Sequence, residues 1–152
     1  MTGASFLDVD FTYVTDPRLR EIVTEFHKEA VSAYQAKNYV AAVVLAGGVL
    51  EGILTFALLR RGEEAVEEYK RLRNRSQELA NWSLNDLVEV AARLNLVGES
   101  PAKAANAVRD FRNFVHPYRL LRRSRPRWDA LATMALSAVA VVSESLQGRI
   151  DP

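Results

Sequence analysis

Four polar residues at the start of the last third of the chain share one face of a predicted helix. Their spacing of i, i+3, i+4 and i+7 places them within about one quadrant of the helix; they are Arg109, Arg112, Asn113 and His116. A guanidinium offers phosphate a planar fork of donors, and an imidazole titrates near neutral pH. Cleaving a phosphodiester needs both a cation and a proton acceptor or donor, so this face is a candidate catalytic site. The alternative is a solvated arginine pair beside a structural histidine.

The opposite face of this segment is apolar and predicts a side that packs into a core. It comprises Ala104, Ala107, Val108, Phe111, Phe114 and Val115. We expect the helix to start at Ser100-Pro101 and to end before Pro117, because proline disfavours the α conformation in the residue before it. His116 would then lie in the last turn of the helix, beside an irregular segment.

The residues that follow Pro117 mix basic and aromatic side chains. Five arginines fall between positions 119 and 127, with Tyr118 and Trp128 at the two ends. Such a mixture suits single-stranded nucleic acid, through phosphate pairing and base stacking. We expect Tyr118, Arg119, Arg122 and Arg123 to bind nucleic acid; a solvated connecting loop is the alternative.

A long apolar segment supplies the element around which the other helices are expected to pack. Residues 40–59 contain a single charge, Glu51, and three glycines. The length would suit a membrane span. However, a charge near the middle is costly there, and the glycines dilute the hydrophobicity. We therefore expect a buried central helix over 38–60, capped by Asn38, and no membrane association.

Glu51 needs a partner inside such a fold, because a buried carboxylate is otherwise expected to take up a proton. The nearest candidates by chemistry are the arginines of the polar face. We predict an ion pair of Glu51 with Arg109 or Arg112. The alternative is that Glu51 reaches a helix N-terminus or solvent.

The remaining patterns predict an all-α protein, an antiparallel helical bundle of five to six helices around the central apolar one. Further helices are expected over 16–37, 63–80, 83–94 and 126–147, the first capped by Asp16 before Pro17. Residues 1–15 form an N-terminal arm, which lies on the domain, lies on a partner subunit or frays. Residues 16–148 form a single domain. His27 borders the apolar stripe of its helix and is predicted to be a packing histidine.

Composition limits the possible chemistry of these 152 residues. The chain has no cysteine, which excludes disulfides, and two distant histidines do not make a metal site, so neither metal nor cofactor is expected. The net charge of +1 does not by itself imply a charged partner. The first residues lack the basic start of a secretory signal, so we expect a cytoplasmic protein.

Two stretches, together with the order of helices, resemble the HEPN superfamily of all-α bundles. They are V-L-A-G-G-V-L-E-G-I-L on the apolar helix and R-D-F-R-N-F-V-H-P over residues 109–117. The family motif is an arginine, commonly followed by a polar residue, with a histidine after four to six further positions. Arg109 has six residues between it and His116. Arg112-Asn113 has the favoured polar pair but only three residues before His116, so which arginine has the family role stays open.

The resemblance implies a metal-independent endoribonuclease that acts as a homodimer, with two motifs lining one cleft. His116 would assist attack by the RNA 2′-hydroxyl or protonate the leaving oxygen, Arg109 or Arg112 would hold the phosphate, and Asn113 would bind the phosphate or fix His116. Such enzymes often serve as toxins or in antiphage defence, which would add a cognate protein partner. Other members are non-catalytic modules for dimerisation or for binding nucleotides, nucleic acids or proteins, so enzymatic activity stays open.

Overall fold

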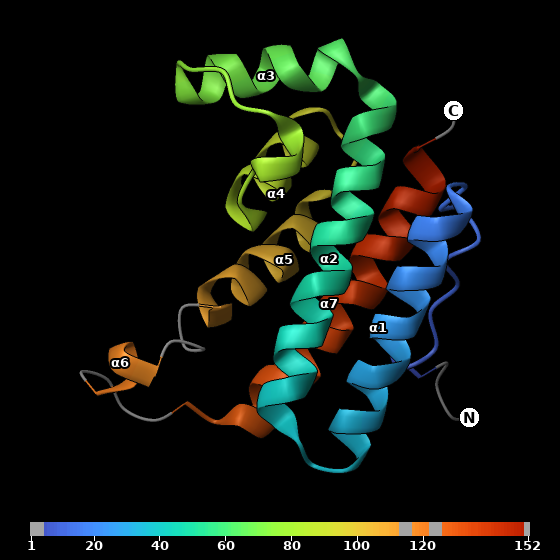
Figure 1. Cartoon of the computed structure of the whole chain (residues 1–152), viewed down its shortest axis with the longest axis vertical. Coiled ribbons are helices and arrows are strands. Elements are labelled where there is room, and N and C mark those ends of the chain that lie inside the picture. Colours follow the sequence, from blue (N-terminus) through green and yellow to red (C-terminus); the bar gives the residue numbers. More distant parts are fainter. Residues whose placement is uncertain (1–4, 113–116, 122–125, 151–152) are drawn as a thin grey trace.

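The computed structural model describes residues 5–112, 117–121 and 126–150, with helix geometry alone for 109–112, 119 and 120. Every regular element in this part of the chain is helical (Figure 1). In order they are α1 (Pro17–Gln35), α2 (Tyr39–Arg61), α3 (Glu63–Arg73), a 3-10 turn (Leu79–Asn81), α4 (Leu84–Arg93), α5 (Glu99–Arg112), α6 (Pro117–Leu120) and α7 (Trp128–Arg149). Six of them have ten residues or more, which confirms the predicted all-α bundle.

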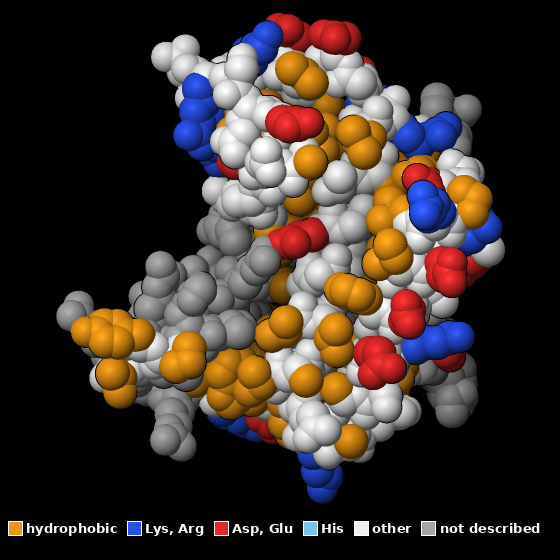
Figure 2. All heavy atoms as spheres, in the orientation of Figure 1, with side chains coloured by type: hydrophobic (Ala, Val, Ile, Leu, Met, Phe, Trp, Pro, Cys, Tyr) orange, Lys and Arg blue, Asp and Glu red, His pale blue; other side chains and the backbone are white. Residues whose placement is uncertain are grey.

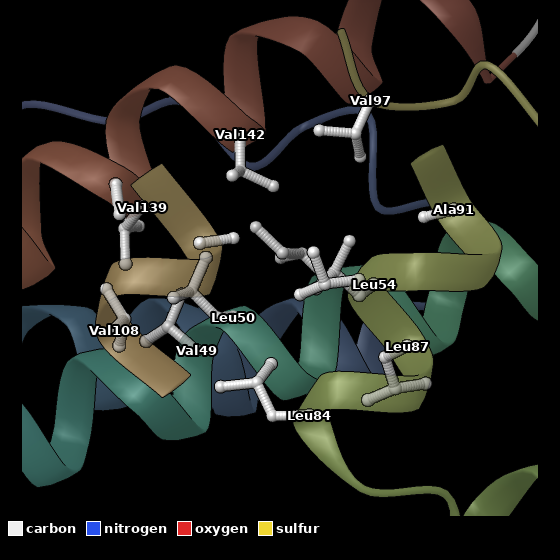
Figure 3. Packing of buried hydrophobic residues seen from close by; sticks show 14 of the residues in the cluster. Val49, Leu50, Leu54, Leu84, Leu87, Ala91, Val97, Val108, Val139 and Val142 are labelled. Carbon is white, nitrogen blue, oxygen red and sulfur yellow. The ribbon is translucent and has the colours of Figure 1, made fainter. Parts of the chain in front are cut away.

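Helix α2 is the central element, as its apolar sequence predicts. It packs most extensively against α1, which runs antiparallel to it, and against α7, and it also contacts α3, α4 and α5 (Figure 1). Ten of its residues are buried, among them Leu50, Ile53 and Leu54, which are fully inaccessible. Figure 3 shows Leu50 and Leu54 surrounded by side chains from α4, α5 and α7. A helix that is apolar on most sides is thus accommodated by neighbours on most sides.

Two helices, α2 and α7, are long and apolar enough to cross a membrane among the residues that could be searched. In the fold, 56% of the apolar window of α2 and 50% of that of α7 are buried inside the protein. The core helices of a bundle have the same length and composition, so this finding favours neither a membrane nor an aqueous location.

Two glycines of α2 have opposite surroundings, and this gives a matched test of the packing. A Cβ built on Gly52 would lie 2.8 Å from Cγ1 of Val23, whereas a Cβ on Gly47 would meet nothing within 4 Å. Val23 is a buried, β-branched side chain and has little freedom to move. The glycine at position 52 therefore allows the close approach of α1 and α2.

We expect Gly52→Ala to destabilise the protein by about 1–2 kcal/mol, because overpacking outweighs the gain in helix propensity. Gly47→Ala should instead stabilise it by about 0.5–1 kcal/mol, since only the propensity gain applies. Urea unfolding of both variants and the wild type measures the two changes. Equal shifts for both variants would contradict the predicted contact between Gly52 and Val23.

Most helix ends follow the predicted signals, and three do not. Asp16 caps α1, its Oδ1 accepting from the backbone N–H of Arg18 at 3.0 Å and of Leu19 at 3.1 Å. The predicted cap at Asn38 is wrong, because its side chain makes no capping hydrogen bond. The predicted helix over 63–80 is too long: α3 ends where Asn74 adopts a left-handed conformation, with φ of 54°. Helix α7 ends at Arg149, two residues beyond the predicted end at residue 147.

The N-terminal arm lies on the domain in its described part, residues 5–15. Phe11 and Val14 are buried in the main core. The hydroxyl of Ser143 on α7 donates to the hydroxyl of Tyr13 at 2.8 Å, and the ring of Phe6 meets Tyr34 of α1 edge-on at 5.9 Å. Of the three placements considered for the arm, the structure therefore shows the intramolecular one.

Candidate functional site

The structure places two of the four candidate catalytic residues on a helix. Arg109 and Arg112 lie in the last turn of α5, and α6 begins at Pro117. Three residues correspond to about one turn, so the two arginine positions lie one above the other on α5. Their side chains, and Asn113 and His116 altogether, lie outside the described residues. The prediction that one helix continues to His116 therefore stays a prediction.

The face that α5 turns toward the bundle differs from the predicted one. Val108 is buried as expected, but the other buried positions are Ala102 and Ala105, whereas Ala104 and Ala107 are only partly buried. Figure 3 shows Val108 close to Val49 and Leu50 of α2 and to Val139 of α7. The buried side is thus shifted from the predicted one, although Ala104 still packs against the core, because alanine fits an inner and an outer position equally well.

This rotation changes where the arginine positions fall. Arg109 follows Ala105 by four residues, and Arg112 follows Val108 by four. Residues four apart share a helix face. Both arginine positions therefore continue the bundle-facing stripe of α5, at the end of the helix nearest α6 (Figure 1). The polar face predicted from the sequence therefore overlaps the side of α5 that packs against the bundle.

Asn106 is a polar residue of this region that the sequence analysis missed. Its Oδ1 is buried and has no hydrogen-bond partner. It precedes Arg109 by three residues and Asn113 by seven, so it lies at the edge of the same face by helical spacing. This helical spacing is the feature of the sequence that could have identified Asn106. A buried acceptor without a donor is costly, which makes Asn106 a candidate member of the site rather than a packing residue.

Glu51 lies on α2 directly after Leu50, the residue that Figure 3 shows near Val108. It is partly buried, and it has an interaction partner. The arginine side chains predicted to pair with it lie outside the described residues, so the ion pair stays a prediction. Its place on α2 beside the contact with α5 is compatible with such a pair.

The predicted nucleic-acid-binding residues begin on α6, where the predicted alternative was a loop. Tyr118 is 74% exposed and Leu121, just after the helix, is 78% exposed. An aromatic side chain this open to solvent is available for stacking. The side chain of Arg119, and Arg122 and Arg123 altogether, lie outside the described residues.

His27 is a packing histidine, as predicted. It is 6% exposed, and its ring meets Phe11 of the arm edge-on at 5.3 Å. Burial lowers the pKa of His27 below its ordinary value, and the charge of Asp8 opposes this effect in part. Its Nε2 has no hydrogen-bond partner. His27 is thus a neutral side chain in a site that does not favour its charged form.

Within the described residues, no group of three or more histidine, aspartate or glutamate side chains could hold a metal ion. The fold and the arginine positions define an all-α bundle with a basic motif at the end of a bundle-facing helix. No family model, no curated protein and no solved structure matches this chain. No match identifies a HEPN domain, and the resemblance rests on the two sequence stretches and the order of helices.

Proposed function

We propose that this protein is a metal-independent endoribonuclease of the HEPN type. The observation that carries the proposal is the pair of arginine positions one turn apart on α5, four residues beyond the buried Ala105 and Val108. Two arginines one turn apart would give a phosphodiester two guanidiniums to bind, which is a dense positive site. Tyr118 on α6, five residues after Asn113 in the sequence, is exposed and offers a ring on which a base can stack.

In this proposal His116 takes the proton from the RNA 2′-hydroxyl or gives one to the leaving 5′-oxygen. Arg109 or Arg112 neutralises the charge that develops on the phosphate, and Asn113 hydrogen-bonds the phosphate or orients His116. The 2′-oxygen bonds to phosphorus as the bond from phosphorus to the 5′-oxygen breaks. The products are a 2′,3′-cyclic phosphate and a 5′-hydroxyl, and no metal ion takes part.

The experiment that tests this is cleavage of a mixed-sequence single-stranded RNA by the purified protein in the presence of EDTA. Product ends are identified by their response to phosphatase and kinase treatment. Cleavage that survives EDTA and leaves cyclic phosphate supports the proposal. Cleavage that EDTA abolishes, or an intact RNA after prolonged incubation, contradicts it.

A non-catalytic binding or dimerisation module is the second candidate, and one observation favours it. The arginine positions continue the bundle-facing stripe of α5, and Glu51 on the adjoining part of α2 is partly buried and has a partner. If Glu51 pairs with these arginines, their charge serves the fold. The motif would then be a structural network.

The proposed enzyme is a homodimer, and the structure offers one face for it. We define the apolar α1–α2 face by five large, exposed side chains, which are Ile22, Phe26, Val40, Val44 and Leu59, each between 40% and 60% exposed. Phe26 lies against Gly48, which joins the parts of the face on the two helices. Figure 2 shows apolar side chains gathered along α1 and α2. Large apolar side chains that are exposed on one side of a protein are typical of an interface.

We expect Val44→Glu to weaken self-association by at least about tenfold, because a twofold interface would bury the new charge on both copies. Sedimentation velocity over a concentration series measures the dissociation constant. Val141→Glu is the matched control, since Val141 is 38% exposed on α7 and lies outside this face. A wild type that stays monomeric at high concentration, or equal effects of the two variants, would contradict the proposed dimer face.

A further inference from the structure

His27 is the exception among the three polar residues that are buried in the described part of the chain. The other two buried polar residues have partners: Asp86 accepts from Nε of Arg73 at 2.7 Å, and Ser143 donates to Tyr13 at 2.8 Å. His27 Nε2 has none. A buried imidazole that is not hydrogen-bonded at Nε2 is tolerated when neutral and is costly when charged.

The N-terminal arm is the element that covers His27. Phe11 meets the His27 ring at 5.3 Å, and the backbone N–H of Val14 donates to the carbonyl of Phe11 at 2.9 Å. Beyond Val14 the arm is held by long contacts: Nη1 of Arg20 lies 3.4 Å from the carbonyl of Val14, and Nη1 of Arg60 lies 3.5 Å from Oγ1 of Thr15. The buried Phe11 and Val14, several partly buried apolar side chains of the arm and a few polar contacts thus hold it on the domain; the partly buried ones are Phe6, Leu7, Val9 and Tyr13.

The arm does not fill the surface that it crosses. A pocket of 440 Å³ separates it from α1 beside His27, and another of 250 Å³ separates it from α7. Asp8 and Asp10 of the arm line both pockets, Lys28 of α1 lines the first, and Glu144 of α7 lines the second.

We propose that the arm, residues 5–15, is an acid-sensitive latch across α1 and α7, docked while His27 is neutral and released when His27 takes up a proton. The groups around His27 set the sign. Asp8 favours the imidazolium, whereas Lys28 on the same helix carries a like charge. Asp10 of the arm is the other carboxylate in the pocket beside His27. Burial under Phe11 outweighs the attraction of Asp8.

The direction of the pH effect follows from these groups. In the docked arm the pKa of His27 is lowered, and in the released arm it returns toward the ordinary value of 6.5. The released state therefore binds more protons, so docking is strongest above pH 6.5 and weakens as the pH falls through that value. Between pH 7.5 and 5.5 the ratio of released to docked arm rises by up to about tenfold. Most carboxylates stay ionised in this range.

Amide hydrogen exchange tests the latch, because it detects rare opening in the folded protein. The probe is the Val14 N–H, which donates to Phe11, and the reference is the Leu94 N–H, which donates to the carbonyl of Val90 at 3.0 Å far along the chain. After correction for intrinsic rates, we expect Val14 protection to fall by up to about tenfold from pH 7.5 to 5.5, and Leu94 protection to change less. Equal losses at both amides would mean global unfolding and would overturn the proposal.

Two variants make the assignment to His27 specific. His27→Leu should keep Val14 protected and remove the pH dependence, since no titrating group remains under Phe11. Asp8→Asn should enlarge the acid-induced loss, because the charge that favours the docked imidazolium is gone. A pH response in His27→Leu like that of the wild type overturns the latch. Should the leucine variant fail to dock its arm, an unchanged response in Asp8→Asn overturns it instead.

Discussion

His116→Ala is expected to lower the rate of RNA cleavage by about a hundredfold or more, which is the usual effect of losing a general acid or base. The cause is chemical, since alanine can neither accept the 2′-hydroxyl proton nor protonate the leaving oxygen. The measurement is the single-turnover cleavage rate with EDTA present, at protein concentrations above the dissociation constant of the dimer. Melting temperatures are measured alongside, so that an unfolded variant is not taken for an inactive one.

The chain provides its own controls for this result. His27→Leu removes the other histidine, which is buried beneath the arm with 6% of its surface exposed. This variant should leave cleavage at neutral pH unchanged. Lys103→Ala removes a cation from α5 that is exposed and lies 3.4 Å from Glu99, and it should also be neutral. Cleavage that persists in His116→Ala, or is lost equally in a control, would contradict the assigned role.

The two arginines can be separated in the same assay. The alanine variant of the arginine that binds the phosphate should lose cleavage and keep its stability, since that guanidinium acts on the substrate. If the other arginine pairs with Glu51, its alanine variant should lose stability as well, because a partly buried carboxylate is left without its cation. Loss of stability in both variants with no cleavage in the wild type would support the binding-module alternative.

Leu54→Ala is expected to destabilise the protein by about 3 kcal/mol, the second large effect. Leu54 is fully inaccessible on the central helix, and Figure 3 shows it among buried side chains of α4 and α7. Truncation removes apolar surface from the core and leaves a cavity that well-packed neighbours fill only in part. The free energy of unfolding from urea titration, at unchanged slope, measures the loss.

Met134→Ala is the matched control for the core, because Met134 is 45% exposed on α7. We expect its effect to stay within about 0.5 kcal/mol, as for most surface substitutions. A loss for Leu54→Ala no larger than that of Met134→Ala would show that α2 does not form the centre of the bundle. A changed urea slope would indicate that the variant no longer unfolds in one step.

Much of the fold could be predicted from local signals in the sequence. Asp16-Pro17 fixes the start of α1 through two backbone N–H groups that the carboxylate accepts. The long apolar run predicts α2, because a helix that is apolar on most sides is expected to be covered on most sides. Two helix ends were not predicted: Asn38 makes no capping hydrogen bond, and Asn74 ends α3 early. Both depend on the conformation that an asparagine adopts, and several conformations are open to it.

The candidate site was less predictable, and α5 shows the reason. Its alanines occur on several sides of the helix, so periodicity could not distinguish Ala104 and Ala107 from the buried Ala102 and Ala105. The difference is decided by which side meets α2 and α7. The rotation brings the positions of Arg109 and Arg112 onto the bundle-facing stripe, and the fold leaves Oδ1 of Asn106 buried without a partner, which helical spacing alone does not show.

The sequence by itself therefore determined the class of fold, the central helix and the positions of the basic motif along the chain, because these follow from hydrophobic periodicity, caps and residue chemistry. The tertiary structure alone decided the rotation of α5, the burial of His27 beneath the arm and the close contact of Gly52 with Val23. Each of these depends on contacts between residues far apart in sequence, and such contacts form only when the helices pack against one another.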